Sequence, residues 1–176
     1  MRLLGVNGIR CFDNPVVPNV GDEIARIAPI VEFRNTEISG MNFYEVGRFR
    51  RYRDELVGRY DDGVPTVVLG HSLGGVIGCA VAKRFKQSKV VGIITINSPH
   101  AYCGYSTLLD ARGELPAPIV TFGCVRDRVV LWGAKHAASV RHTVLDVDHF
   151  REIAENRAHA RYIAETACRS LFAPGT

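Results

Sequence analysis

The chain has 176 residues, enough for one domain with a sizeable core, and 47% hydrophobic with 23% charged residues is ordinary for a soluble globular protein. Its net charge of +4 is too small and too dispersed to indicate nucleic-acid binding. No segment approaches the roughly 18 apolar residues of a membrane span, so we expect no stable membrane insertion.

Strand-like and helix-like segments alternate from end to end of the chain. Apolar, β-branched runs predict strands at Arg2–Val6, Ile30–Phe33, Thr66–Leu69, Val90–Ile96, Ile119–Phe122 and Arg141–Val147. Helical patterns occupy Val20–Ile27, Phe43–Tyr60, Val76–Phe85 and Asn156–Phe172, with a short helix expected within Val129–Ala138 and loops at Asn7–Asn19, Asn35–Asn42 and Ser98–Pro118. Strands separated by helical crossovers predict a three-layer α/β fold, with a mostly parallel sheet and helices on both faces, in a single domain spanning residues 1–176.

The segment Gly70-His71-Ser72-Leu73-Gly74 joins the predicted strand Thr66–Leu69 to the predicted helix Val76–Phe85. G-x-S-x-G between a strand and a helix is typical of a nucleophile elbow, where a sharp turn projects the serine hydroxyl from the edge of the sheet. The two glycines fit because strand and helix backbones pass close together at such a turn. An ordinary tight turn that happens to contain a serine is the alternative interpretation. The context favours Ser72 as a catalytic nucleophile.

A serine nucleophile needs a base and an acid, which follow it in the chain order serine, acid, histidine. Asp127 lies a few residues past the predicted strand Ile119–Phe122, and His149 lies just past the last predicted strand. Open parallel sheets place their sites at these carboxyl ends of strands. We therefore predict that His149 takes the proton of Ser72 and that Asp127 orients the imidazole.

Other residues compete for these roles. Asp127 lies between two arginines, so a surface ion pair is its alternative role. Asp146 and Asp148 are too near His149 in the sequence to be the usual orienting acid. In an elbow, the side chain of His71 is expected to point away from the base and to be structural.

The oxyanion of an acyl-transfer intermediate needs backbone N–H donors. Leu73 supplies one, because it follows the serine at the start of a helix. The second is expected from Ile9, in the loop after the first strand, where Gly8 lets the substrate approach the backbone. We further predict that Asn7, Gly8, His100 and Tyr102 line the substrate site; loop packing is the alternative for His100.

These features together resemble an α/β-hydrolase of the smallest kind, similar to the lidless Bacillus lipase A type. The resemblance is carried by the His-Ser-Leu-Gly-Gly elbow, Val31–Phe33, Val90–Asn97, the Asp127 loop and Asp148-His149, and by Ile96-Asn-Ser-Pro-His100. It implies a six-stranded sheet in the order 2-1-3-4-5-6, an exposed nucleophile and metal-free ester hydrolysis. The usual His-Gly of the oxyanion loop is Asn7-Gly8 here.

The predicted function is hydrolysis of a small-molecule or lipid carboxylic ester through an acyl-enzyme, with no cofactor or metal. Histidines and cysteines are scattered without a metal-ligand spacing such as CxxC or H-E-x-x-H. An acyltransferase, a thioesterase and a phage-type cell-envelope esterase are alternatives on the same triad, since triad chemistry does not select the acyl donor. A noncatalytic binding protein of the same fold is a further alternative.

The five cysteines are widely spaced and odd in number, which indicates reduced thiols in a reducing compartment. With no signal-peptide pattern after Met1, we expect a cytoplasmic protein, or one released by host lysis if it is phage-encoded. Nothing in the sequence predicts the oligomeric state.

Overall fold

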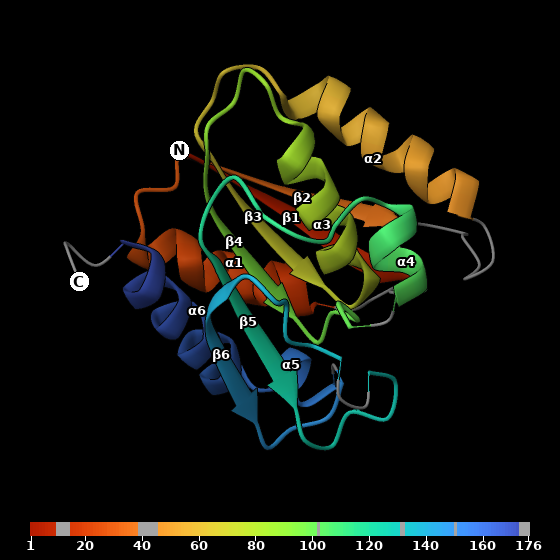
Figure 1. The fold of residues 1–176 in the computed structure, drawn as a ribbon. Helices are drawn as coiled ribbons and strands as arrows, with labels where there is room; N and C mark the ends of the chain where they lie inside the picture. Colours follow the sequence, from red (N-terminus) through yellow and green to blue (C-terminus); the bar gives the residue numbers. More distant parts are fainter. Residues whose placement is uncertain (10–14, 39–45, 102, 131–132, 150, 173–176) are drawn as a thin grey trace.

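A computed structural model describes residues 1–9, 15–38, 46–101, 103–130, 133–149 and 151–172 (Figure 1). Its six strands form one sheet in the order β2-β1-β3-β4-β5-β6, and every neighbouring pair is parallel. The strands are β1 (Arg2–Ile9), β2 (Glu32–Ile38), β3 (Thr66–His71), β4 (Val90–Ile96), β5 (Ile119–Cys124) and β6 (Ser139–Leu145). The predicted α/β fold and strand order are therefore confirmed, and the sheet is parallel throughout.

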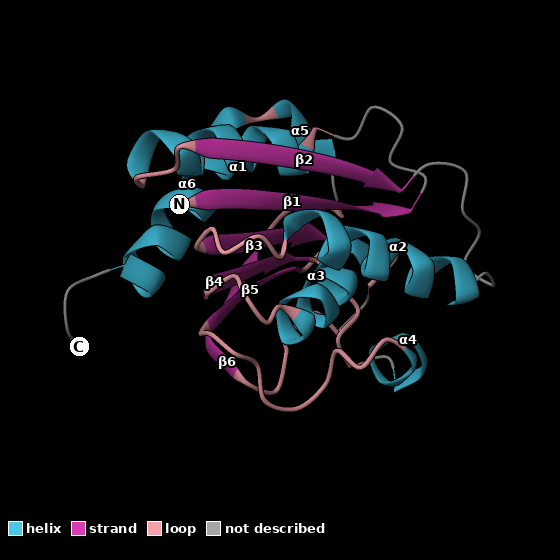
Figure 2. Ribbon diagram, turned by 90° about the horizontal axis from the view of Figure 1, so that it is seen from above, coloured by secondary structure: helices cyan, strands magenta, loops and turns pink. Residues whose placement is uncertain are grey.

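Helices cover both faces of the sheet, as a parallel sheet requires (Figure 2). One face carries α1 (Val16–Ile27), α5 (Arg151–Glu155) and α6 (Arg157–Phe172), whose apolar side chains form one core with Leu69, Ile94 and Phe122. The other face carries α2 (Val46–Tyr60) and α3 (Leu73–Arg84), with the short α4 (Cys103–Leu108) beyond them. Among the described residues no helix is long and apolar enough to cross a membrane.

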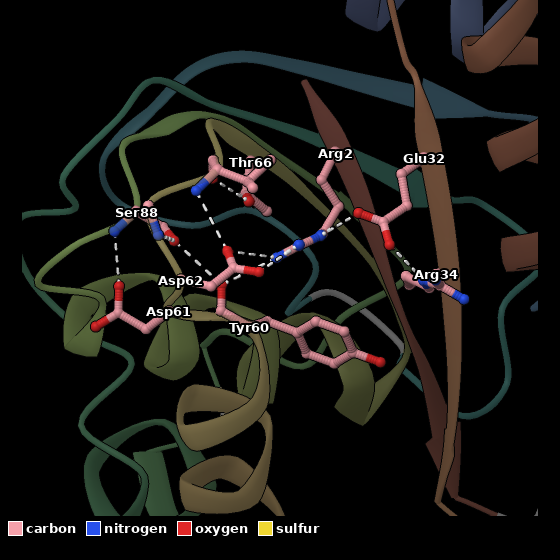
Figure 3. Close-up of polar contacts among 10 residues, drawn as sticks. Arg2, Glu32, Arg34, Tyr60, Asp61, Asp62, Thr66 and Ser88 are labelled. Atoms are coloured by element: carbon pink, nitrogen blue, oxygen red, sulfur yellow. Dashed lines mark hydrogen bonds and ion pairs between the residues drawn. The ribbon is translucent and has the colours of Figure 1, made fainter.

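The amino ends of the first three strands are tied together by Arg2 (Figure 3). Arg2 is 4% exposed, and its guanidinium bonds to Glu32 at 2.9 Å and to Asp62 at 2.7 Å. It also donates to the Tyr60 carbonyl at 3.0 Å and lies over the Tyr60 ring. Next to it, Asp61 accepts the amides of residues 86–88. This group, Arg2, Glu32, Tyr60, Asp61 and Asp62, is called the Arg2 rim below.

Several element bounds differ from the prediction. Helix α1 begins at Val16, four residues before the predicted start, because Pro18 lies in the first turn, where the helix needs no N–H from it. Strand β2 extends to Ile38 through polar residues, since an edge strand faces solvent on one side and needs no continuous apolar run.

The short helix predicted within Val129–Ala138 is wrong for the described part of that segment, which has no helix. The Asp127 carboxylate accepts the amides of Val129 at 2.6 Å and Val130 at 2.8 Å, and so holds the chain in a turn there. Conversely, the predicted loop at Ser98–Pro118 contains α4, and α5 precedes α6.

Candidate active site

Ser72 lies at the turn between β3 and α3, in a backbone conformation with φ 54° and ψ −135°. A non-glycine residue rarely adopts positive φ, and such strain concentrates at functional sites. The turn is held by a hydrogen bond from the Ser72 amide to the Ile96 carbonyl (2.9 Å) and one from the Gly75 amide to the Ser72 carbonyl (3.0 Å). Ser72 is partly exposed.

Glycines are required around this turn because backbones cross there without room for side chains. A Cβ on Gly74 would collide with the Val6 carbonyl oxygen, and one on Gly70 would collide with Gly75. Across the turn, a Cβ on Gly8 would lie 2.7 Å from the Ser72 Cβ and 3.3 Å from its Oγ. The end of β1 therefore packs directly against the serine.

Asp127 and His149, from the loops after β5 and β6, form a close pair. The Asp127 Oδ2 lies 2.6 Å from the His149 Nδ1. The aspartate side chain is fully buried, and that of His149 is 12% exposed. Because the carboxylate accepts there, His149 carries its proton on Nδ1 and leaves Nε2 to accept another.

The electrostatics of this pair keep Asp127 ionised. Burial tends to raise the pKa of its carboxyl, but hydrogen bonds from His149 and from the amides of Val130 and Val129 outweigh burial and hold the pKa below its ordinary value. Asp127 is thus a negative charge fixed in the interior, facing the imidazole. Its surface ion-pair alternative does not hold, because the neighbouring Arg126 pairs with Asp146 and Glu152 instead.

His149 contacts His71, the residue before the serine. The rings of His71 and His149 have centroids 4.9 Å apart, and the Nε2 of His71 lies 3.0 Å from the His149 carbonyl oxygen. The expectation that His71 points away from the base is therefore wrong. Ser72, Asp127 and His149 lie just past β3, β5 and β6, at the carboxyl ends of these strands.

The competing acids have other surroundings. The side chain of Asp146 is 86% exposed and pairs with Arg126. Asp148 and Glu152 bond reciprocally, each through its side chain to the other's amide, at 3.1 and 2.8 Å. Asp127, by contrast, bonds directly to the His149 ring.

The predicted oxyanion donors lie at the end of one element and the start of another: Ile9 ends β1, and Leu73 begins α3. Leu73 is the first residue of α3, where N–H groups have no partner within the helix. Ile9 is the last residue of β1, which continues past Val6 with a break in its register against β2. The predicted loop after Val6 is therefore strand up to Ile9, and residues 10–14 lie outside the described residues.

Of the predicted substrate residues, Asn7 and His100 are buried. Asn7 donates from Nδ2 to Asn35 Oδ1 at 2.9 Å, which ties β1 to β2. His100 is 5% exposed, its Nε2 lies 3.0 Å from Thr95 Oγ1, and burial lowers its pKa to about 3. These contacts favour packing roles for both. Tyr102 lies outside the described residues.

The described residues contain no group of three or more histidine, cysteine or acidic side chains placed to hold a metal ion. Cys79, Cys124 and Cys168 are buried free thiols. Burial raises the pKa of Cys79 and Cys124 to about 12 and that of Cys168 to about 11, so these thiols stay protonated at neutral pH.

Comparisons with known proteins agree with this architecture. The family described as PGAP1-like alpha/beta domain matches residues 52–110, which include the elbow. No curated protein sequence matches the chain significantly.

Many solved structures do match. The esterase domain of a Rhodothermus marinus protein has a TM-score of 0.60 and 17% identity, over 94% of this chain and 83% of that one. Mouse alpha/beta hydrolase domain-containing protein 10 has a TM-score of 0.66 and 14% identity, over 94% and 87%. MGS-MChE2, an alpha/beta hydrolase enzyme from the metagenome of lagoon sediments of Mar Chica, Morocco, has a TM-score of 0.63 and 13% identity, over 97% and 91%. From its sheet order, its elbow and these likenesses, the chain has the α/β-hydrolase fold.

Proposed function

We propose that this protein is a serine hydrolase that cleaves carboxylic esters through an acyl-enzyme. One observation carries the proposal: a serine with positive φ at a strand–helix turn follows His71, which contacts His149, and the His149 Nδ1 lies 2.6 Å from a buried aspartate. Nucleophile, base and orienting acid are the three groups that acyl transfer by serine requires.

The chemistry follows from the protonation states. The Nε2 of His149 takes the hydroxyl proton as the Ser72 Oγ attacks the ester carbonyl. The ionised Asp127 stabilises the imidazolium that forms. The proton then passes to the leaving alcohol, and water attacks the acyl-enzyme by the same route.

The oxyanion of each tetrahedral intermediate is assigned to the backbone N–H groups of Leu73 and Ile9. One such donor commonly contributes about 3 kcal/mol to the transition state. The closeness of Gly8 to Ser72 supports this assignment, because a residue without a side chain leaves the space in which the carbonyl would lie.

The test combines labelling with turnover. Purified protein is treated with a fluorophosphonate probe and assayed on p-nitrophenyl esters of graded acyl length. We expect labelling at Ser72 and hydrolysis, and we expect Ser72→Ala to lose both while keeping the circular dichroism of the folded protein. Turnover of Ser72→Ala at the wild-type rate, after removal of contaminating esterases, would exclude Ser72 as the nucleophile.

A further inference from the structure

Two buried side chains converge on one backbone carbonyl, that of His149. The Asn97 Nδ2 lies 2.8 Å from this oxygen, and the His71 Nε2 lies 3.0 Å from it. Both side chains are fully buried. A carbonyl oxygen has two lone pairs, so these two donors use its whole accepting capacity.

Asn97 is held in place by its own backbone. It follows β4, has φ 48°, and its amide donates to the Phe122 carbonyl at 2.8 Å. Asparagine tolerates this left-handed conformation better than most residues. Because a carbonyl only accepts, the NH₂ group of the side chain must face His149.

His71 has a defined protonation state for the same reason. Its Nε2 must carry a proton to donate to the carbonyl. Burial, together with the nearby His149, lowers its pKa to about 3, so the ring is neutral at ordinary pH. A neutral ring is what the site needs, because a cation 4.9 Å from His149 would oppose the imidazolium that forms there during catalysis.

We infer that His71 and Asn97 are positioning residues that hold the His149 carbonyl and thereby set the base against Ser72. This inference rests on the proposed function. Asp127 fixes the ring of His149 at Nδ1, and the Asp148–Glu152 bonds fix the chain after it. The two donors fix the backbone between them. His71 directly precedes Ser72 in the chain and bonds to the His149 carbonyl. The positions of the nucleophile and of the base are therefore both tied to His71.

The kinetic consequence is large, because a displacement of about 1 Å in a catalytic group can lower the rate about 100-fold. We expect His71→Leu to lower kcat about 100-fold on a soluble p-nitrophenyl ester, with KM little changed. His71→Gln places an amide nitrogen near the position of Nε2 and is expected to recover most of the lost kcat. Asn97→Gly keeps the positive φ, removes the amide, and is expected to lower kcat in the same way.

The matched control is His136→Leu. His136 is also a buried histidine, 4% exposed, and its Nε2 lies 3.0 Å from a backbone carbonyl, that of Ala111. The His136→Leu substitution removes a histidine–carbonyl hydrogen bond of the same kind, but at a position that does not contact Ser72, Asp127 or His149 in the contacts described above. We expect it to lower the melting temperature but to leave kcat within about threefold of the wild type, whereas a purely structural role for His71 would make the two variants alike.

An NMR measurement separates this inference from the proposed function. The Nδ1 proton of His149, held by Asp127, should give a downfield signal in the wild type that weakens or moves in His71→Leu and Asn97→Gly but not in His136→Leu. This result supports the inference even if no ester is hydrolysed. An unchanged signal, or kcat of His71→Leu and Asn97→Gly within about threefold of the wild type, would overturn it.

Discussion

The residue on which the site depends, Ser72, has a backbone conformation that costs about 1–3 kcal/mol in an ordinary environment. The fold maintains it through the contacts of Gly8, Gly70 and Gly74, each of which lacks room for a side chain. Ser72 itself lies at the carboxyl end of β3, in the turn to α3. Ser72 is therefore positioned by its neighbours' lack of side chains as much as by its own hydrogen bonds.

The Asp127 carboxylate has a charge and a geometry that a neutral amide lacks. We expect Asp127→Asn to lower kcat by about four orders of magnitude, as loss of the orienting carboxylate does in serine–histidine–aspartate triads. The matched control is Asp146→Asn, which alters an 86% exposed side chain near the same histidine and should keep near-normal kcat. Steady-state kinetics on both variants decides the identity of the acid. An active Asp127→Asn with an inactive Asp146→Asn would reverse the assignment.

Gly8 offers a second test at single-residue scale. An added Cβ would lie 2.7 Å from that of Ser72 and 3.3 Å from its Oγ, in the space that the proposed mechanism assigns to the substrate carbonyl. We expect Gly8→Ala to lower kcat/KM at least tenfold while the protein still folds. The measurement is the rate on a short p-nitrophenyl ester, with Gly47→Ala, at an open position of α2, as the control. Equal rates in the two variants would show that Gly8 does not border the substrate.

Some residues of the site could be predicted from the sequence, and others could not. Ser72, Asp127 and His149 follow strand-like runs, and in a parallel sheet all strand ends with this polarity meet at one edge. The contact from His71 to the His149 carbonyl spans 78 positions of the chain and depends on the path of the last loop. His100 also follows a strand, yet its ring turns inward to Thr95 and to the ring of His136. Strand-end placement does not determine side-chain direction.

At the scale of elements, the strands were easier to predict than the connections. The burial of every residue in β3 and β5 produces the apolar runs seen in the sequence. The segment after β5 has an apolar pattern too, but its described residues form no helix, and Asp127 accepts the amides of Val129 and Val130 in a turn there. A single side chain thus bonds both to His149 and to the amides of this turn.

Gly58 lies within helix α2, where a glycine lowers the stability of the helix. It lies on the exposed side, and a Cβ there would meet no atom within 4 Å. We expect Gly58→Ala to raise the free energy of unfolding by about 0.5–1 kcal/mol, because alanine loses less backbone entropy in a helix. Denaturant unfolding measures it.

Gly78 in α3 is the control, since an added Cβ would lie 2.8 Å from the Val68 Cγ1 in the core. Gly78→Ala should therefore gain nothing or destabilise. A stabilised Gly78→Ala variant would mean that the core adjusts more readily than its packing indicates.

At the scale of the whole molecule, the parallel sheet has two unlike ends. The carboxyl ends of the strands carry Ser72, Asp127 and His149, and the amino ends carry the Arg2 rim. Two apolar cores, one on each face, share the strands between these ends. The Arg2 rim joins β1 to β2 and to the turn after α2, segments about 30 and 60 positions apart in the chain.

The Arg2 rim makes stability depend on pH. The hydrogen bond from Arg2 lowers the pKa of Asp62 to about 2, below its value in an unfolded chain. Its contribution is therefore complete above about pH 4 and is lost as the pH falls through about 2. We expect Asp62→Asn to have a lower melting temperature than the wild type at pH 5 and a smaller difference at pH 2.

Melting curves at a series of pH values check this expectation. Asp22→Asn, which changes an exposed carboxylate on α1, is the control. A difference between Asp62→Asn and the wild type that stays constant from pH 5 to pH 2 would show that the Asp62 charge does not contribute to folding.

The position of the Arg2 rim also has a consequence for directed evolution. Its residues lie at the opposite end of the strands from Ser72, Asp127 and His149, so we expect that a library there can be selected for heat tolerance with little effect on the proposed catalysis. Gains made at that end leave room for the destabilising changes that new substrate preferences usually bring. The two ends of the same strands thus give this protein separate sites for acquiring robustness and for acquiring new specificity.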